Sequence, residues 1–305
     1  MASESGISEL PLRFKLVNAV PAALVVTTAG ALILGGAPQR PPSFDVLVAR
    51  AQAANWFGAV GAIALLAIGA LLLEPFELNS IRVLEGYWST AGPLGRLARF
   101  GRWLHERRRS RLQFLAKMHP ELVEEGIDDE IQTRWPQAWP LLPTALGNRL
   151  RAFEEQAGSA YQLDTIELWP RLYYALPESA LGTVNGYRTQ LDVASRLSLS
   201  LLTSALIAAG LLFAHGWWLT LPAVLVLSSW LAYRAALAAA GNYCVAVRAV
   251  IDVYRLKLLQ AMQLKMPANL GEEQVINEAL SRVWRGDPAA DLTYAPAEPG
   301  RVTPS

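Results

Sequence analysis

Residues 197–214 read LSLSLLTSALIAAGLLFA and residues 217–233 read WWLTLPAVLVLSSWLAY, and neither run contains a charged side chain. Only His215 and Gly216 separate them. A helix needs about 20 apolar residues to cross the hydrocarbon core of a bilayer. Because that core offers the backbone no hydrogen-bond partners, apolar runs without alternation are helical. The two runs therefore predict a transmembrane hairpin with a very short outer turn.

Two further uncharged runs lie near the N-terminus. They are LVNAVPAALVVTTAGALILGG at 16–36 and WFGAVGAIALLAIGALLL at 56–73. The first is too long for the apolar part of a cleavable signal peptide, so we expect it to stay in the mature protein. The sequence thus predicts four transmembrane helices.

The composition agrees with a membrane protein. Hydrophobic residues make up 52% of the 305 residues and charged residues 17%, where soluble domains carry about 25% charged residues. This apolar balance excludes an intrinsically disordered chain. Cys244 is the only cysteine, which excludes a disulfide scaffold. The 27 basic and 26 acidic residues nearly cancel, so net charge alone indicates no partner.

The distribution of Lys and Arg predicts the orientation in the membrane. Between the second and third runs, residues 96–117 carry eight basic side chains and one acidic side chain, Glu106. The predicted outer loops carry only Arg40, Asp45 and Arg50 in one and no charge besides His215 in the other. Since cytoplasmic loops are enriched in Lys and Arg, we expect a multi-pass protein of the inner (plasma) membrane with both termini in the cytoplasm.

The fold class that follows is an all-α polytopic membrane protein with a helical cytoplasmic domain. We expect the third and fourth spans to extend into that domain, because Glu178–Ala214 and Trp217–Met262 contain no strong interior helix breaker apart from Gly241. On the second of these helices, Arg248 and Asp252 have the i,i+4 spacing of an ion pair. The predicted parts are a transmembrane pair at 1–75, a cytoplasmic helical domain at 76–177, a long-helix hairpin at 178–266 and a cytoplasmic tail at 267–305 with a disordered last part.

A basic amphipathic helix is predicted within the cytoplasmic domain, followed by an acidic run at 121–130 and a proline-rich loop at 135–143. Three interpretations of the helix stay open: binding to anionic lipid, internal pairing with the acidic run, or binding of a phosphate-bearing ligand through arginine. The candidate residues are Arg96, Arg99, Arg102, Arg107, Arg108, Arg109 and Arg111. Further along, Asp164 and Glu167 have the spacing of a capping box.

Motifs of enzymatic chemistry are missing from the sequence. There is no G-x-S-x-G, no Walker A loop, no G-x-G-x-x-G after a strand and no H-E-x-x-H. The three histidines are scattered, and no Cys/His set has the spacing of metal ligands. We therefore expect no catalytic activity, no cofactor and no metal site.

Polar residues near the third and fourth runs are candidates for a pore. Arg196 and Arg234 lie nineteen residues before and after His215, which places both near one depth at the cytoplasmic mouth. They either snorkel to the headgroups or form a positive ring around a channel axis. Three hydroxyl residues lie one helical turn above Arg196. Their hydroxyls either donate hydrogen bonds to carbonyls of their own helix or of a neighbouring helix, or they line a hydrated pore. These hydroxyl residues are Ser200, Thr203 and Ser204.

The order of elements is two spans, a cytoplasmic insert, a second pair of spans with a short outer turn, and a helical tail. This order is similar to that of bestrophin-type channels and of the stator subunits of proton-driven motors, although the chain carries no residue motif of either family. We expect a homo-oligomeric ion channel or pore controlled by its cytoplasmic domain. The alternatives are a non-conducting anchor or scaffold for an unknown cytoplasmic partner, and a membrane-disrupting effector of bacterial stress or antiviral (phage) defence.

Overall fold

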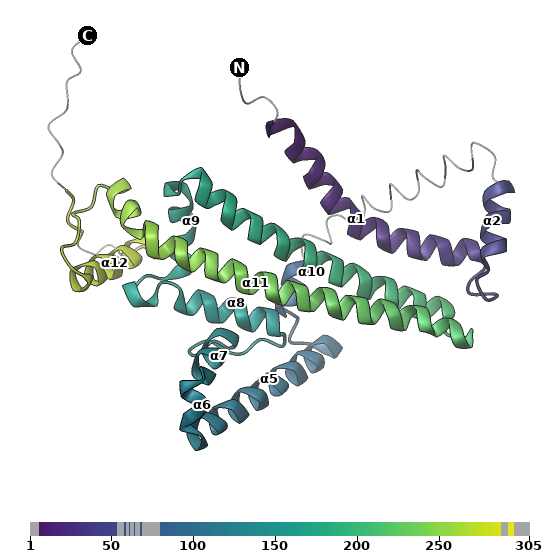
Figure 1. Ribbon diagram of the computed structural model, residues 1–305, viewed down its shortest axis with the longest axis horizontal. Helices are drawn as coiled ribbons and strands as arrows, with labels where there is room; N and C mark the ends of the chain where they lie inside the picture. Colours follow the sequence, from purple (N-terminus) through teal and green to yellow (C-terminus); the bar gives the residue numbers. More distant parts are fainter. Residues whose placement is uncertain are drawn as a thin grey trace, which may run out of the picture. The chain divides into compact units, whose positions relative to one another are not determined.

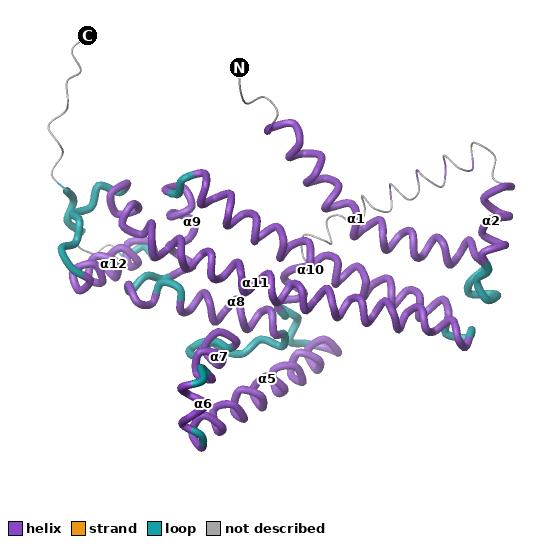
Figure 2. Tube along the Cα trace, in the orientation of Figure 1, coloured by secondary structure: helices purple, strands orange, loops and turns teal. Residues whose placement is uncertain are grey.

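A computed structural model describes residues 6–53, the single positions 58, 61, 64 and 68, residues 80–287 and residues 292–295. Its regular elements are helices joined by short loops (Figures 1 and 2). In the described residues the only β-type pairing is a single antiparallel bridge between Leu264 and Tyr294. The all-helical prediction is confirmed for this part of the chain.

The chain forms two compact units. Unit 1 comprises Met1–Tyr87 and Thr189–Ala239, and unit 2 comprises Trp88–Arg188 and Ala240–Ser305. Two long helices, α10 (Glu178–Leu212) and α11 (Thr220–Ala261), therefore each contribute one segment to unit 1 and another to unit 2. Both were expected to be unbroken beyond the apolar runs, and the structure confirms this, including at Gly241.

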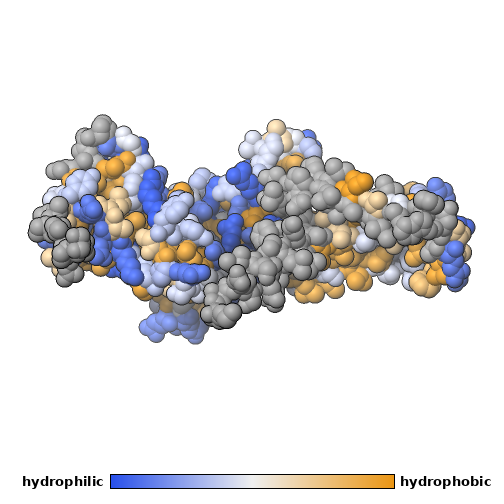
Figure 3. Space-filling model, turned by 90° about the horizontal axis from the view of Figure 1, so that it is seen from above, coloured by the Kyte–Doolittle hydropathy of each residue, from blue (hydrophilic) through white to orange (hydrophobic). Residues whose placement is uncertain are grey.

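Both long helices meet the requirements for crossing a bilayer. The helical stretches Glu178–Leu212 and Gly216–Ala261 each contain an apolar window of 18 residues, and only 39% and 28% of those windows are buried within the chain. The second stretch includes a 3₁₀ turn, η2 (Gly216–Leu219). Apolar side chains that are not buried by their own chain need an apolar solvent or a partner. Figure 3 shows such hydrophobic residues on the surface of unit 1, and they indicate a membrane location.

The four predicted spans are only partly accounted for. The first run lies in α1 (Gly6–Gly35), and within its described side chains Val20–Gly35 is an apolar helical segment. The second run, 56–73, lies outside the described residues except for single positions. Two helices of the described chain thus qualify as spans, and a four-span topology stays a prediction.

The end of α1 packs against the turn between α10 and α11 within unit 1. Leu32 and Ala37 form a buried cluster with Ala208 and Leu212 of α10. The His215 ring nitrogen Nε2 lies 2.8 Å from the carbonyl oxygen of Pro38. A short helix, α2 (Phe44–Ala53), follows α1, and Arg50 on it donates hydrogen bonds to the Ile33 and Leu34 carbonyls of α1 at 3.3 and 2.9 Å.

Such a guanidinium satisfies carbonyl groups that a helix end leaves without intrahelical partners. The segment predicted as a plain outer loop is therefore a capped and folded turn. A further short helix, α4 (Ser80–Glu85), completes the described part of unit 1.

Unit 2 is a helical domain assembled around the extensions of α10 and α11. Its remaining elements, in chain order, are α5 (Gly92–Met118), α6 (Pro120–Glu124), α7 (Ile127–Arg134), α8 (Ala145–Gln156), η1 (Ser159–Tyr161), α9 (Thr165–Ala175) and α12 (Leu270–Trp284). The core joins Leu168 and Leu172 of α9 to Val184 of α10 and to Val247 and Ile251 of α11, all of them fully or almost fully buried. The long helices are thus core elements of unit 2 as well as apolar elements of unit 1.

The proline-rich loop between α7 and α8 is held by side chains of α8. Asn148 is fully buried and exchanges hydrogen bonds with the Leu142 backbone, at 2.7 Å to its N–H and 2.8 Å to its carbonyl. The Glu155 carboxylate accepts from the backbone N–H groups of Gln137 and Ala138, both at 2.6 Å. Because prolines remove backbone donors, these side chains replace the regular hydrogen bonding that the loop lacks.

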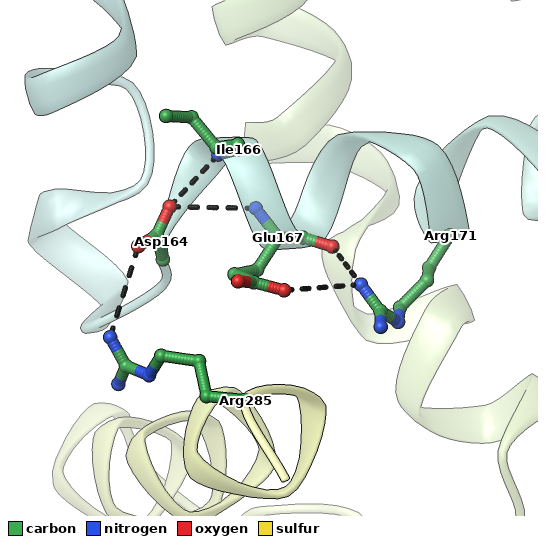
Figure 4. Close-up of polar contacts among 5 residues, drawn as sticks. All are labelled: Asp164, Ile166, Glu167, Arg171 and Arg285. Atoms are coloured by element: carbon green, nitrogen blue, oxygen red, sulfur yellow. Dashed lines mark hydrogen bonds and ion pairs between the residues drawn. The ribbon is translucent and has the colours of Figure 1, made fainter.

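The predicted capping box at the start of α9 forms only in part (Figure 4). Asp164 accepts hydrogen bonds from the backbone N–H groups of Ile166 and Glu167 at 2.9 and 3.4 Å. The Glu167 side chain, however, turns toward Arg171 at 3.5 Å instead of returning to the Asp164 backbone. Arg285, just beyond α12, lies 3.9 Å from the second Asp164 oxygen. A favourable i,i+4 cation competes for the carboxylate that the box would need.

A short part of the C-terminal tail pairs with the segment that follows α11. Leu264 pairs with Tyr294, and backbone hydrogen bonds join Lys265 to Thr293 and Ala295 to Gln263. The disorder expected for the last part of the tail stays a prediction. Residues 296–305 lie outside the described residues.

Candidate functional site

Two serines join the helices of the hairpin within unit 1. Ser198 donates to the Ser229 carbonyl at 3.0 Å, and Ser229 donates to the Ser198 carbonyl at 2.8 Å, with both side chains buried. Small hydroxyl residues allow close helix approach in an apolar environment, and their hydroxyls bond across the interface. This reciprocal pair fixes the register of α10 against α11.

That register locates the two candidate arginines. Ser198 lies opposite Ser229, so residue 231 is opposite Arg196, and Arg234 follows three residues later. At 1.5 Å per residue, the two arginines are offset along the hairpin by about 4.5 Å. Arg234 is exposed, and its guanidinium lies 5.7 Å from the centre of the Trp230 ring. Arg196 is half-buried. Their place at the mouth of a pore stays a prediction.

The three hydroxyl candidates are turned into the packing of their own chain. Thr203 is half-buried and donates to the carbonyl of Leu199, one turn earlier on α10, at 2.9 Å. Ser200 and Ser204 are buried within unit 1. A pore-lining role for these three residues stays a prediction, and in the single chain the hydroxyls do not form an open polar face.

The basic helix α5 exposes both charge and apolar surface. The exposed apolar side chains are Leu94, Leu97, Phe100, Trp103, Phe114 and Met118. Of the seven candidate arginines, Arg102 and Arg109 are half-buried, and the exposed ones are Arg96, Arg99, Arg107, Arg108 and Arg111. Arg107 stacks over Trp103 at 5.4 Å. Aromatic and basic side chains on one exposed helix are the combination found in helices that lie at an anionic membrane surface.

The opposite side of α5 packs closely against the proline-rich loop. A Cβ atom at Gly101 would lie 2.5 Å from the Pro143 carbonyl oxygen, so only glycine permits this approach. His105 is buried, and the Trp135 indole N–H donates to its Nδ1 at 3.3 Å. Burial and the nearby Arg108 charge lower the pKa of His105 from its ordinary value. Neutral His105 is therefore part of the packing between α5 and the loop.

Internal pairing between the basic helix and the acidic run, one of the three interpretations left open, does not take the form of ion pairs in the described residues. α5 packs against α6 and α7, which carry the acidic side chains. In the described chain, however, the acidic run pairs only locally, through Glu121 with His119 and Glu130 with Arg134. Arg109 instead donates to the Gln137 side chain at 3.0 Å. The exposed arginines therefore keep their capacity to bind an external anion.

A pocket in unit 2 was not anticipated from the sequence. It lies between α7, α8 and α11, has a volume of about 220 Å³, and is lined by Thr133, Arg149, Phe153, Gln156, Gly241, Cys244, Val245 and Arg248. Burial raises the pKa of Cys244 to about 12, although the charges of Arg149 and Arg248 act in the opposite direction. The sequence could have predicted this pocket only in part. The helical spacing of the four lining residues of α11 shows that they share one face, but no local pattern shows which residues of α7 and α8 lie opposite them.

Within the residues that the structure describes, no group of three His, Cys, Asp or Glu side chains is arranged to hold a metal ion. Comparison of the chain with protein-family models, with curated proteins and with solved structures found no match. The function must therefore be argued from the geometry of the chain itself.

Proposed function

We propose that the protein is a homo-oligomeric membrane protein whose transmembrane helices form an ion-conducting pore under the control of unit 2. The observation that supports this proposal is the continuity of α10 and α11. Each helix has an apolar segment in unit 1 and a segment buried in the core of unit 2. Because packed helices are stiff, a rearrangement in the core of unit 2 would move the apolar segments.

Conduction in this proposal depends on charge at the inner end of the hairpin. Arg196 and Arg234 lie at similar positions along α10 and α11, and several copies around an axis would present a ring of positive charge. Such a ring raises the local concentration of anions and lowers that of cations within about 8 Å at physiological salt.

The test is ion flux through the purified full-length protein in liposomes. We expect current, and we expect Arg196→Glu and Arg234→Glu each to shift the reversal potential in a salt gradient toward cation selectivity. Lys265→Glu, a charge reversal at an exposed site in unit 2, is the matched control and is expected to leave selectivity unchanged. If the protein conducts but neither arginine substitution changes its ion selectivity, Arg196 and Arg234 do not lie at the pore mouth.

A second candidate function is a non-conducting anchor that holds a cytoplasmic partner. It is favoured by the burial of Ser200 and Ser204 and by the reciprocal bonding of Ser198 with Ser229, which leave little polar surface on the hairpin. Absence of current from a purified oligomer under voltage, at low pH and with added nucleotides would favour this function. A strict monomer in detergent, measured by mass, would contradict the oligomeric pore directly.

A further inference from the structure

The pocket on α11 combines two guanidinium groups with an apolar wall. One face of α11 contributes four lining residues, at spacings of three, one and three along the helix. They are Gly241, Cys244, Val245 and Arg248. Arg149 approaches from α8, and a Cβ atom at Gly241 would lie 3.5 Å from its Nη1. The Arg149 guanidinium therefore lies close to the backbone of α11 at Gly241.

The charge at the pocket is positive because an expected ion pair does not form. Arg248 was predicted to pair with Asp252, but the Tyr161 hydroxyl donates to Asp252 at 2.9 Å instead. The exposed Arg248 is left to line the pocket. Arg149 and Arg248 supply two positive charges that act on Cys244, and Glu154 supplies one negative charge.

The remaining lining residues and the cavity volume limit the chemistry and the size of a ligand. The donor of Thr133 is engaged with the Asp129 carbonyl at 2.8 Å, and one N–H of the Gln156 amide with the Gln132 carbonyl at 2.8 Å. The two guanidiniums are thus the charged groups of the lining, while Phe153 and Val245 supply apolar surface. The volume of about 220 Å³ is below the roughly 300–1,000 Å³ of sites for drug-sized molecules.

We propose that this pocket binds a small organic phosphate, with the phosphate between Arg149 and Arg248 and an apolar body against Phe153, Cys244 and Val245. Guanidinium groups match phosphate oxygens in pairs. A dianionic phosphate monoester is favoured over a monoanionic carboxylate, because the two guanidiniums outweigh the one carboxylate of Glu154 and the net positive charge attracts a dianion more strongly. The site stands independently of conduction, and only its role as a control of the pore rests on the proposed function.

Cys244 gives a direct readout, because it is the only cysteine of the chain and lines the pocket. The full-length protein in non-ionic detergent at pH 9 would be treated with anionic and with cationic methanethiosulfonates. After correction for their rates with free cysteine, we expect the anionic reagent to react about tenfold faster. Arg248→Gln should remove most of this preference, whereas Arg111→Gln, at an exposed site on α5, should keep it. Gly241→Ala, which narrows the pocket without changing charge, should slow both reagents equally.

Protection by a ligand completes the test. Phenyl phosphate should slow the reaction of Cys244 with neutral methyl methanethiosulfonate in a saturable manner, more strongly than inorganic phosphate or benzoate does, and this protection should be lost in Arg248→Gln. Equal rates for the two charged reagents, no protection by phenyl phosphate, or no reaction of Cys244 with any reagent would each overturn the proposal. None of these outcomes depends on whether the protein conducts ions.

Discussion

Replacing Asn148 by alanine is expected to lower the melting temperature of the protein by about 10 °C, through a loss of about 3 kcal/mol. The side chain is fully buried and makes three hydrogen bonds to backbone groups, at 2.7 Å to the Leu142 N–H and at 2.8 Å to the carbonyls of Leu142 and Thr144. Alanine leaves these polar groups without a partner, and a buried unsatisfied group costs about 1–3 kcal/mol. The loop that α8 organises would lose its attachment.

The matched control is Asn242→Ala, because Asn242 is an exposed residue of α11. Alanine is the better helix former at such a site, so we expect no loss of stability there. The comparison is made by thermal unfolding of the two variants in the same detergent. Equal melting temperatures for Asn148→Ala and Asn242→Ala would show that the hydrogen bonds of Asn148 do not hold unit 2 together.

Replacing Arg255 by methionine is expected to cost about 3–5 kcal/mol, since it leaves the carboxylate of Glu273 buried without its cation. The Arg255 Nε lies 2.6 Å from the Glu273 carboxylate, and 6% of the Glu273 side chain is exposed. The guanidinium also stacks over the Tyr161 ring at 3.8 Å. Methionine keeps apolar length over the ring but removes the charge, so the change tests the ion pair that fastens α12 to α11.

Two further variants make this test specific. Arg282→Met removes an ion pair with Asp287 that is much more exposed, and exposed pairs contribute about 0–1 kcal/mol. The double variant Arg255→Met with Glu273→Met replaces the whole buried pair by apolar side chains, and we expect it to recover most of the lost stability. Similar losses for Arg255→Met and Arg282→Met, or a double variant no more stable than Arg255→Met, would contradict the assigned role of Glu273.

Elements governed by local pattern could be predicted from the sequence. Helix α10 starts at Glu178, directly after a proline, which is favourable at the first helical position. No proline follows within the helix, so the backbone hydrogen bonding can continue to Leu212. The apolar runs at 197–214 and 217–233 are similarly local signals, and they correspond to the two helices that are long enough to cross a membrane.

Contacts decided by distant parts of the chain could not be predicted. Arg248 and Asp252 have ideal spacing for an ion pair, yet Tyr161, 91 residues before Asp252, takes the carboxylate as its hydrogen-bond acceptor. The basic helix and the acidic run are close in the fold, yet the structure describes no ion pair between them. Spacing along one helix says which residues share a face, but it does not say which partner from another helix competes for them.

The candidate pore residues show the same limit. Periodicity placed Ser200, Thr203 and Ser204 on α10 above Arg196, but whether a polar face turns toward a pore or toward a neighbouring helix depends on the pairing of helices. In unit 1 the pairing is set by Ser198 and Ser229, which bond across the hairpin. Sequence pattern therefore located the polar residues of the hairpin without specifying their environment.

The central claim, that the α10–α11 hairpin crosses a membrane with unit 2 in the cytoplasm, is tested most directly by cysteine labelling in cells. In a Cys244→Ser background, single cysteines would replace Ser43, Leu206, Trp217 and Ser110. Trp217 is preferred to its neighbour Gly216, whose φ of +47° disfavours any side chain. Leu206 is 66% exposed in the chain, so water would reach it if the hairpin were not in lipid.

A membrane-impermeant maleimide should label the cysteines at Ser43 and Trp217 in intact cells, and the one at Ser110 only after permeabilisation. The cysteine at Leu206 should stay unlabelled in both conditions, because hydrocarbon excludes the reagent. Labelling at Ser110 in intact cells would show that unit 2 lies outside the cell and would contradict the predicted orientation. Labelling of Leu206 as fast as Ser110 in permeabilised cells would contradict a membrane-spanning hairpin.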